Sequence, residues 1–422
     1  MKTIIISCLF LLSAICPVFS EIISKNGNGF LEKRNDQLIL HLKGTPYERG
    51  YQHGVLLREQ IQHNIATYID APKSSNQGRV EEFVKNISTL ISYVSANDLE
   101  EMKGLAEGSG SDMNKIIILN LFPEMFHCSG ITVAGPATKN EDLYHVRILE
   151  YAIGKNLQNT AVLQIVEPDH GISYLNVSYA GFIGVITGMN QEKIAIGEIG
   201  GLGYGSWQGI PMAFLLKEII QNATSLDDVK KTLQNSLRTC EYYYVFSDGK
   251  TCESIGVYAT ASQLHFISPG DSYALLAPSH LPENYAENGD NDKFILTSCS
   301  IENTAYQTLL FERDHRLALL FRLQLPKCLL LTGFPHPERY PVLAERTLDK
   351  YGKIDEKVLM EIIKRPVTRE SNLHTAIFQP SQLKVWVAHA GPNNEPACDQ
   401  SYNEWDLLDL LQDSSFLQSS KG

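Results

Sequence analysis

The sequence predicts an α+β fold in which a helical segment comes first and antiparallel sheets follow. Before residue 127, apolar side chains recur at spacings of three and four, which is typical of one face of a helix. After residue 127 the period changes mostly to two, and strand-like runs are separated by turn residues. Two helical patterns, 209–223 and 225–235, interrupt the strands. We therefore expect sheets with helices packed against them.

The clearest helical pattern before the change lies in 79–94, where six apolar residues share one face: Val80, Phe83, Val84, Ile87, Ile91 and Val94. A looser stripe of the same kind runs through 51–69. Residues 97–110 predict a short helix that ends at glycines, and Asp112 can cap the next one. The segment 21–127 is therefore predicted to be helical.

The second part of the chain predicts strands and two hairpins. Strand-like runs occupy 130–135, 143–151, 160–168 and 171–179. One hairpin turns across Asp248 and Gly249, and a second spans 373–391. Ser225 and Asp228 have the spacing of a capping box, and a further helix is expected over 311–322.

The first twenty residues are typical of a secretory signal. Lys2 precedes an apolar run that is short for a membrane span, and the small residue Ser20 marks a cleavage point. A buried N-terminal strand is the alternative. A secreted or lysosomal protein is expected, and three sequons, at Asn86, Asn176 and Asn222, fit a glycoprotein.

Charge and cysteine content exclude several classes of function. The formal net charge is −12, and it becomes −13 without the signal, which argues against nucleic acid as a partner. No later stretch is apolar for long enough to cross a membrane. Six of the eight cysteines lie after the signal, without a CxxC pair, so neither a zinc site nor any other metal site is expected. The even number permits three disulfides, but the spacing shows no framework.

Cys128 lies where the helical segment ends and the first strand begins. A cysteine at that position can act as an N-terminal nucleophile once the bond between His127 and Cys128 is cut. The thiol attacks the preceding carbonyl, a thioester forms, and water releases a chain that starts at Cys128. The freed α-amino group, with a pKa of about 8, then serves as the base for its own thiol. A buried structural cysteine is the alternative.

Two charged residues follow in the next strand-like run. Arg147 and Glu150 are three positions apart, so an extended strand sends them to opposite faces unless a bulge or strand end intervenes. If both reach one site, Arg147 holds the thiolate or the substrate carbonyl and Glu150 holds the new amine. A surface salt bridge is the alternative.

Five stretches together resemble acyl-coenzyme A:6-aminopenicillanic acid acyltransferases, which are cysteine peptidase family 45 of the N-terminal-nucleophile hydrolases. More distantly, the sequence is similar to bile-salt hydrolases and acid ceramidase. The stretches are "GTPYERGYQHG" at 44–54, "CSGITVAG" at 128–135, "RILEY" at 147–151, "GMNQEKIAIGEIGG" with the following helices, and "NLHTAIFQPSQLKVWVAHAGP" at 372–392.

The resemblance implies a four-layer αββα sandwich and a division of the chain into 1–20, 21–127 and 128–422. Residues 21–127 are then a propeptide or small chain that stays associated with the catalytic body after cleavage. Cys128 is implied as nucleophile, with Arg147 and Glu150 in the places of the family's arginine and aspartate. Ser279 stands where the family has an oxyanion-binding asparagine, unless backbone N–H groups near Gly200 and Gly201 replace it.

The implied activity is hydrolysis or transfer of an acyl group from a linear N-acyl amide, which is a small molecule or lipid, without a cofactor. Two other functions stay open, an inactive relative with a binding role and a phospholipase or esterase. The helix carrying Arg313 and Arg316 matches the family loosely and is otherwise a solvated face. Tyr242 to Tyr244 line an acyl pocket or pack in a sheet. The histidines His53, His280 and His374 are interpreted as structural.

Overall fold

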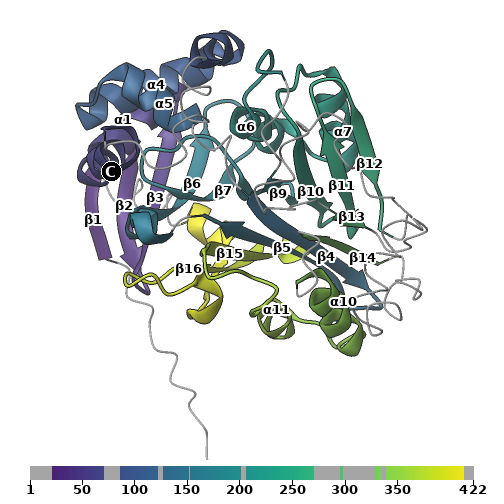
Figure 1. The fold of residues 1–422 in the computed structure, drawn as a ribbon. Helices are drawn as coiled ribbons and strands as arrows, with labels where there is room; N and C mark the ends of the chain where they lie inside the picture. The colour runs from purple at the N-terminus through teal and green to yellow at the C-terminus, as the bar shows by residue number, and fades with distance from the viewer. Residues whose placement is uncertain are drawn as a thin grey trace, which may run out of the picture.

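The computed structural model describes residues 21–70, 86–121, 127–151, 153–200, 206–269, 295–297, 328–333 and 339–412. Within them, strands and helices are arranged in layers (Figure 1). Several predictions lie outside these residues: the signal at 1–20, the first part (79–85) of the helix expected over 79–94, the helix expected over 311–322, Cys299, Ser279, His280 and Gly201.

The N-terminal segment begins with strands rather than helices, so the prediction of a helical segment from residue 21 is wrong for its first part. The strands are β1 (Glu21–Asn26), β2 (Gly29–Arg34) and β3 (Gln37–Gly44). Asn35 and Asp36 both have positive φ, 47° and 63°, which is the backbone of a two-residue hairpin turn. The sequence signal for these strands was the Asn35–Asp36 turn, which is flanked on both sides by alternating apolar and polar residues.

Helices follow these strands as predicted. They are α1 (Pro46–Leu56), α2 (Arg58–Ile65), the π-helix η1 (Ala66–Asp70), the 3₁₀ turn η2 (Ile91–Tyr93), α4 (Ala96–Ser109) and α5 (Met113–Leu121). The α4 helix ends at Gly110 in the left-handed region, and Asp112 accepts hydrogen bonds from two main-chain N–H groups at the start of α5. Both features confirm the sequence prediction.

The strands form two sheets. The first contains β1, β2, β3, β6 (Ala161–Pro168), β7 (Tyr174–Tyr179), β8 (Thr187–Asn190), β9 (Ile194–Gly200), β10 (Tyr242–Asp248), β11 (Glu253–Ala259) and β12 (Leu264–Ile267) in that order. The second contains β13 (Ile295–Thr297), β14 (Leu329–Gly333), β4 (His127–Gly135), β5 (Glu141–Glu150), β15 (Asn372–Gln379), β16 (Lys384–His389) and β17 (Asn403–Asp406). The sheets meet where His127 of β4 pairs with Gly200 of β9.

Helices cover the outer faces of both sheets. The described residues also contain α6 (Met212–Asn222), α7 (Leu226–Asn235), α10 (Tyr340–Asp349), α11 (Glu356–Ile362) and the short turns η4 (Ile153–Lys155), η5 (Leu157–Thr160), η7 (Pro380–Gln382) and η8 (Ala397–Asp399). Figure 1 shows α1, α4, α5, α6 and α7 on one side of the strands and α10 and α11 on the other.

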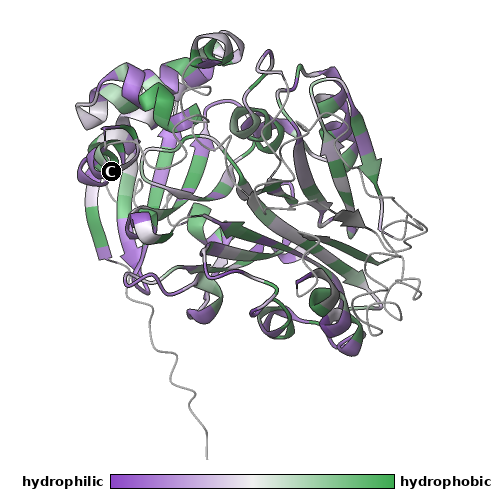
Figure 2. Cartoon of the chain, in the orientation of Figure 1, coloured by the Kyte–Doolittle hydropathy of each residue, from purple (hydrophilic) through white to green (hydrophobic). Residues whose placement is uncertain are grey.

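Separate apolar clusters fill the spaces between these layers. Leu216 and Ile220 of α6 are buried in one cluster with Ile196 of the first sheet. Val177 and Phe378 belong to a second cluster, between the sheets. A third cluster joins α10 and α11 to the second sheet. The helices carry hydrophilic as well as hydrophobic residues, as elements with one buried face do (Figure 2). The predicted αββα sandwich is confirmed.

Helices α1 and α4 pack backbone to backbone through glycines, which explains the two spaced glycines of "GTPYERGYQHG". A Cβ atom added to Gly50 would lie 1.9 Å from the carbonyl oxygen of Glu101, and one added to Gly104 would lie 2.2 Å from that of Tyr47. Gly54 and Gly108 make the same kind of contact one turn further on. The glycine spacing therefore lets the two helices cross in close contact.

Gly50→Ala is expected to lower the free energy of unfolding by about 3 kcal/mol, because two rigid backbones must move apart to admit one methyl group. Thermal unfolding monitored by circular dichroism measures the change. Gly154→Ala is the matched control, since a Cβ atom there meets nothing within 4 Å. Equal melting temperatures for the two variants would show that the crossing tolerates a side chain.

Candidate active site

Cys128 is the second residue of β4, in the middle of the molecule. The strand forms because Ile131, Thr132 and Val133 are β-branched residues, which favour extended backbone. Cys128 pairs with Leu149 of β5, and its side chain is fully buried. The thiol is therefore sealed from solvent in the uncleaved chain.

Arg147 and Glu198 lie next to this thiol. The Cys128 Sγ donates to Glu198 Oε2 over 3.6 Å. Arg147 donates from Nη2 to the same oxygen over 2.9 Å, and from Nε to the Glu198 main-chain carbonyl over 2.9 Å. Both charged side chains are completely buried. A side chain at Gly197 would exclude Arg147, since a Cβ atom there would lie 2.9 Å from the Arg147 Cγ.

Burial dominates the ionisation of this group. It raises the pKa of the Cys128 thiol well above its usual range, while the charge of Arg147 lowers that pKa and the charge of Glu198 raises it. Burial also raises the pKa of Glu198 to about 7, against the opposing effects of Arg147 and of the thiol hydrogen bond. Glu198 therefore changes charge near neutral pH, and its negative form opposes the thiolate.

Glu150 occupies the opposite face of β5 from Arg147, because the register between β4 and β5 is unbroken from His127 to Val133. Its Oε1 accepts a hydrogen bond from Arg339 Nη2 over 2.7 Å and one from the Arg369 main-chain N–H over 2.7 Å. The Glu150 main chain forms a hydrogen bond with the Cys128 thiol that lowers the pKa of the thiol, whereas the charge of the Glu150 carboxylate raises that pKa. The alternative of a surface salt bridge between Arg147 and Glu150 is wrong, since both are buried and have other partners.

The structure brings Cys128 and Arg147 together on one face of the sheet and places the Glu150 side chain on the other face. It also adds two residues that sequence reasoning missed. Glu198 is a lone acid in the otherwise apolar strand β9, which was a usable signal. Arg339 lies 189 residues from Glu150, and no local pattern marks it. Ser279, Arg313 and Arg316 lie outside the described residues. Gly200, at the end of β9, pairs with His127 of β4 across the junction of the two sheets.

The histidines and tyrosines named from the sequence have structural contacts. His53 Nε2 accepts from the Gly181 main-chain N–H over 3.0 Å, and burial lowers the pKa of His53 to about 3. His374 contacts the hydroxyl groups of Tyr179 and Thr187 at 2.8 and 3.0 Å. Tyr242 and Tyr244 are buried and stack on each other, and Tyr243 packs on Tyr258. The sheet-packing interpretation of the tyrosines is confirmed.

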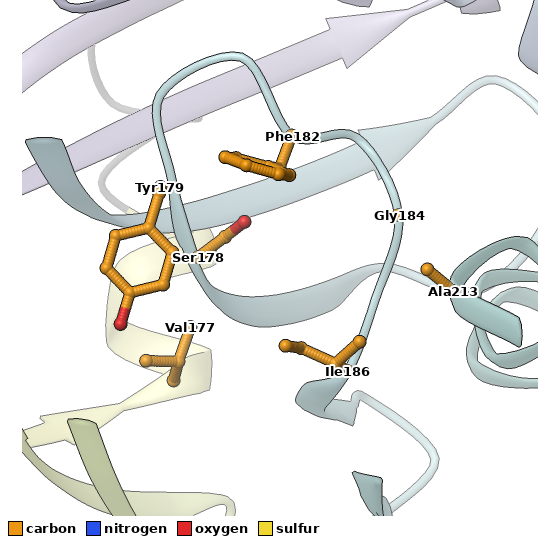
Figure 3. Close-up of a pocket in the computed structure, with 7 residues that line it drawn as sticks. All are labelled: Val177, Ser178, Tyr179, Phe182, Gly184, Ile186 and Ala213. Carbon is orange, nitrogen blue, oxygen red and sulfur yellow. The ribbon is translucent and has the colours of Figure 1, made fainter. Parts of the chain in front are cut away.

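A small, mainly apolar cavity of about 20 Å³ lies beside Tyr179 under the loop that connects β7 and β8 (Figure 3). Its lining residues are Val177, Ser178, Tyr179, Phe182, Gly184, Ile186 and Ala213. Tyr179 also contacts His374 in the space between the sheets. The Tyr179 side chain therefore reaches from the cavity to His374, and the charge of Arg147 acts on its hydroxyl group.

The three sequons differ in exposure. Asn222 is exposed at the end of α6, and Asn86 is partly exposed. Asn176 is 1% exposed in the interior strand β7, and its amide donates to Gln164 and to the Gly184 carbonyl. A glycan on Asn176 does not fit this structure, so that prediction is corrected.

No disulfide involves the five described cysteines after the signal, which are Cys128, Cys240, Cys252, Cys328 and Cys398. Among the described residues, no three His, Cys, Asp or Glu side chains come together in a way that could hold a metal ion. No helix in the described ranges is long and apolar enough to cross a membrane.

Comparison with known proteins gives distant relatives. The chain is similar to Protein dcd1A of Dictyostelium discoideum, with 30% identity over 279 residues, which cover 56% of this chain and 63% of that protein. It is similar to acid ceramidase of Heterocephalus glaber, with 24% identity over 252 residues, which cover 51% of this chain and 60% of that protein. The chain thus spans about three fifths of the length of these curated relatives. No protein-family model matches the chain.

Two solved structures are also similar. One is a Caenorhabditis elegans N-acylethanolamine-hydrolyzing acid amidase ortholog, with 13% identity, a TM-score of 0.37 and coverage of 66% of this chain and 99% of that chain. The other is a conjugated bile acid hydrolase of Clostridium perfringens, with 13% identity, a TM-score of 0.36 and coverage of 67% and 93%. The resemblance to acid ceramidase is confirmed as distant sequence similarity, whereas the assignment to the family 45 acyltransferases is not confirmed.

Proposed function

We propose that this protein is an N-terminal-cysteine amidohydrolase that activates itself by cutting the bond between His127 and Cys128. The observation that carries the proposal is the buried group of Cys128, Arg147 and Glu198, in which a thiol contacts a carboxylate and lies beside a cation. The distant similarity to acid ceramidase supports an amide as substrate.

The self-cleavage follows from these contacts. Glu198 takes the thiol proton, and the sulfur attacks the carbonyl carbon of His127. The carbon–nitrogen bond breaks as Glu198 returns the proton to the Cys128 nitrogen, which leaves a thioester and a free α-amino group. Water then hydrolyses the thioester, giving a carboxylate at His127 and a free thiol at Cys128.

The mature thiol attacks the substrate in the same manner. The α-amino group of Cys128 accepts the thiol proton, the thiolate attacks the amide carbonyl, and the proton passes to the leaving amine. Arg147 stabilises the thiolate by its charge. Water releases the acyl group as a carboxylic acid, whereas an amine acceptor gives acyl transfer. A linear N-acyl amide, as in lipids or amino acids with an acyl tail, is the proposed substrate class.

Extensive contacts support the proposal that the two parts stay associated after cleavage. Strand β3 of the first part is hydrogen-bonded to β6 of the second, inside one sheet. Lys217 forms buried salt bridges to Asp98 and Glu101 at 2.8 and 3.0 Å across the same boundary. Asn64 donates to Thr160 and Ala180 over 2.9 and 2.8 Å.

A secretory or lysosomal location is part of the proposal. The signal-like start and the accessible sequons at Asn86 and Asn222 support passage through the secretory pathway.

An inactive relative is the second candidate, and a specific observation favours it. The thiol is fully buried, and burial raises its pKa. In this reading Cys128 is a core residue and the chain stays whole. An esterase differs only in the leaving group.

N-terminal sequencing of the secreted protein tests the proposal. We expect two associated chains, residues 21–127 and 128–422, which by numbering are 107 and 295 residues long. Incubation at pH 5 and pH 7, followed by denaturing electrophoresis, shows whether cleavage occurs during acidification. N-acyl amides and esters of equal acyl length then separate amidase from esterase. An intact chain under all these conditions would favour the inactive relative.

A further inference from the structure

Arg339 is a buried arginine on the opposite side of β5 from Arg147. It precedes α10 and is 5% exposed. Its Nη2 donates to Glu150 Oε1 over 2.7 Å and to Ser129 Oγ over 3.4 Å, and its Nε donates to the Val367 carbonyl over 2.8 Å. The guanidinium is thus held by the main chain on one side while it binds the Glu150 carboxylate on the other.

The Glu150 carboxylate is fixed asymmetrically. Oε1 accepts from both Arg339 and the Arg369 main-chain N–H, whereas Oε2 has no hydrogen-bond partner among the described residues. Glu150 is the β-ladder partner of His127, whose carbonyl is bonded to the Cys128 nitrogen. One carboxylate oxygen is therefore anchored, and the charge of the carboxylate acts on Cys128, the residue that would carry the new amine after cleavage.

The negative charge of the Glu150 carboxylate affects the pKa of the α-amino group that Cys128 would carry after cleavage. The α-amino group of Cys128 must be neutral to accept the thiol proton, and its ordinary pKa is about 8. A carboxylate nearby stabilises the ammonium form and raises that pKa, which weakens the base in acid, while a cation acts in the opposite direction. Arg339, in direct contact with Glu150, offsets the negative charge at the point where it would act.

The other charged and titratable groups around Cys128 also enter this balance. Arg147 of β5 and Glu198 of β9 face the thiol as an ion pair, and Tyr179 of β7 is within electrostatic reach of Cys128. Arg147 and Glu198 offset each other when Glu198 is ionised, and Arg147 is left as a cation when Glu198 is protonated. Glu150 and Arg339 form the second pair near the amine.

We propose that Arg339 is a positioning residue, which orients Glu150 toward the α-amino group of Cys128 and offsets its charge so that the amine stays usable as a base. This inference rests on the proposed function. It assigns Arg339 a role that acts through Glu150 and not on the substrate.

The test is the pH dependence of kcat/KM for an N-acyl amide, measured on the processed protein. In Arg339→Met the acid limb of this pH profile is expected to move to higher pH by about one unit. The negative charge of Glu150 then lacks its cation and raises the pKa of the amine. Arg339→Lys restores much of the wild-type position. In the double variant Arg339→Met/Glu150→Gln both charges are removed, and the limb is expected to return toward the wild-type position.

Arg346→Met is the matched control. Arg346 lies in α10, two turns after Arg339, and its guanidinium donates to the main-chain carbonyls of Ile362 and Lys364, at 3.0 and 2.7 Å. Its loss is expected to lower stability without moving the acid limb. An equal movement of the limb in this variant, or an unmoved limb in Arg339→Met, overturns the inference.

The outcomes separate this inference from the proposed function. Wild-type protein that is neither cut before Cys128 nor active overturns both. Wild-type protein that is cut and active, with an unmoved limb in Arg339→Met, overturns the role of Arg339 alone. If Arg339→Met does not fold, Glu150→Gln decides, since removing the carboxylate is expected to shift the limb to lower pH, and an unchanged limb contradicts the inference.

Discussion

Replacing Cys128 by alanine is expected to leave a single chain that begins at residue 21 and to reduce amide hydrolysis by roughly a thousandfold or more. The same sulfur is proposed to cut the chain and to attack the substrate, so one substitution removes both activities. Denaturing electrophoresis, N-terminal sequencing and an assay with an N-acyl amide measure the two effects on the same preparation.

Cys398→Ala provides the matched control for the loss of a buried thiol. Cys398 is 3% exposed, and its Sγ lies 3.8 Å from Asp399 Oδ1, outside the group around Cys128. This variant is expected to be cut and to be active. Cleavage between His127 and Cys128 in the Cys128→Ala variant would show that another agent cuts the chain, and the self-cleavage account would then be wrong.

The parts of the fold that the sequence predicts are those with strong local patterns. The strand at Cys128 and the hairpin joining β15 to β16 follow from alternation and β-branched residues. Ser225 caps α7 as its spacing to Asp228 predicts, because its Oγ accepts from the Asp228 main-chain N–H. The Asp228 carboxylate accepts from the Thr224 N–H instead of the Ser225 N–H, so the box is not complete. The first strands were missed because the helical stripe further on was extended backwards over the Asn35–Asp36 turn.

Only those residues of the candidate site that lie close together in the sequence could be predicted from it. Cys128 and Arg147 were identified because one lies at a change of period and the other on the next strand. The opposite orientation of Glu150 also follows from strand parity and is observed. Glu198, however, lies 70 residues from Cys128 and becomes its neighbour only because β9 meets β4 at the junction of two sheets. A long-range pairing of this kind leaves no spacing in the sequence.

Glu198→Gln is expected to change the pH dependence of stability more than any other substitution considered for this group. The ordinary pKa of a glutamate is 4.5, and burial raises that of Glu198 to about 7 in the folded chain. Between these values the folded state binds a proton that the unfolded state has lost. Stability therefore decreases as the pH rises through this window, and the neutral glutamine removes this dependence.

The size of the effect follows from the two pKa values. One pH unit of pKa difference corresponds to about 1.4 kcal/mol, so the free energy of unfolding of the wild type should fall by about 3 kcal/mol relative to Glu198→Gln between pH 4 and pH 8. Denaturant unfolding at several pH values measures this difference. A Cys128→Ala background keeps both proteins as single chains, and because the thiol hydrogen bond lowers the pKa of Glu198, its removal does not weaken the effect.

Glu48→Gln serves as the matched control, since Glu48 is an exposed carboxylate whose capping hydrogen bonds with Thr45 lower its pKa. The stabilisation by Glu48 depends on pH in the opposite direction to that by Glu198, because it is present at neutral pH and is lost in acid. Parallel pH profiles for the wild type and Glu198→Gln would mean that the Arg147 ion pair keeps Glu198 charged throughout. A permanently ionised Glu198 could still accept the thiol proton, but the expected decrease of stability between pH 4 and pH 8 would then be wrong.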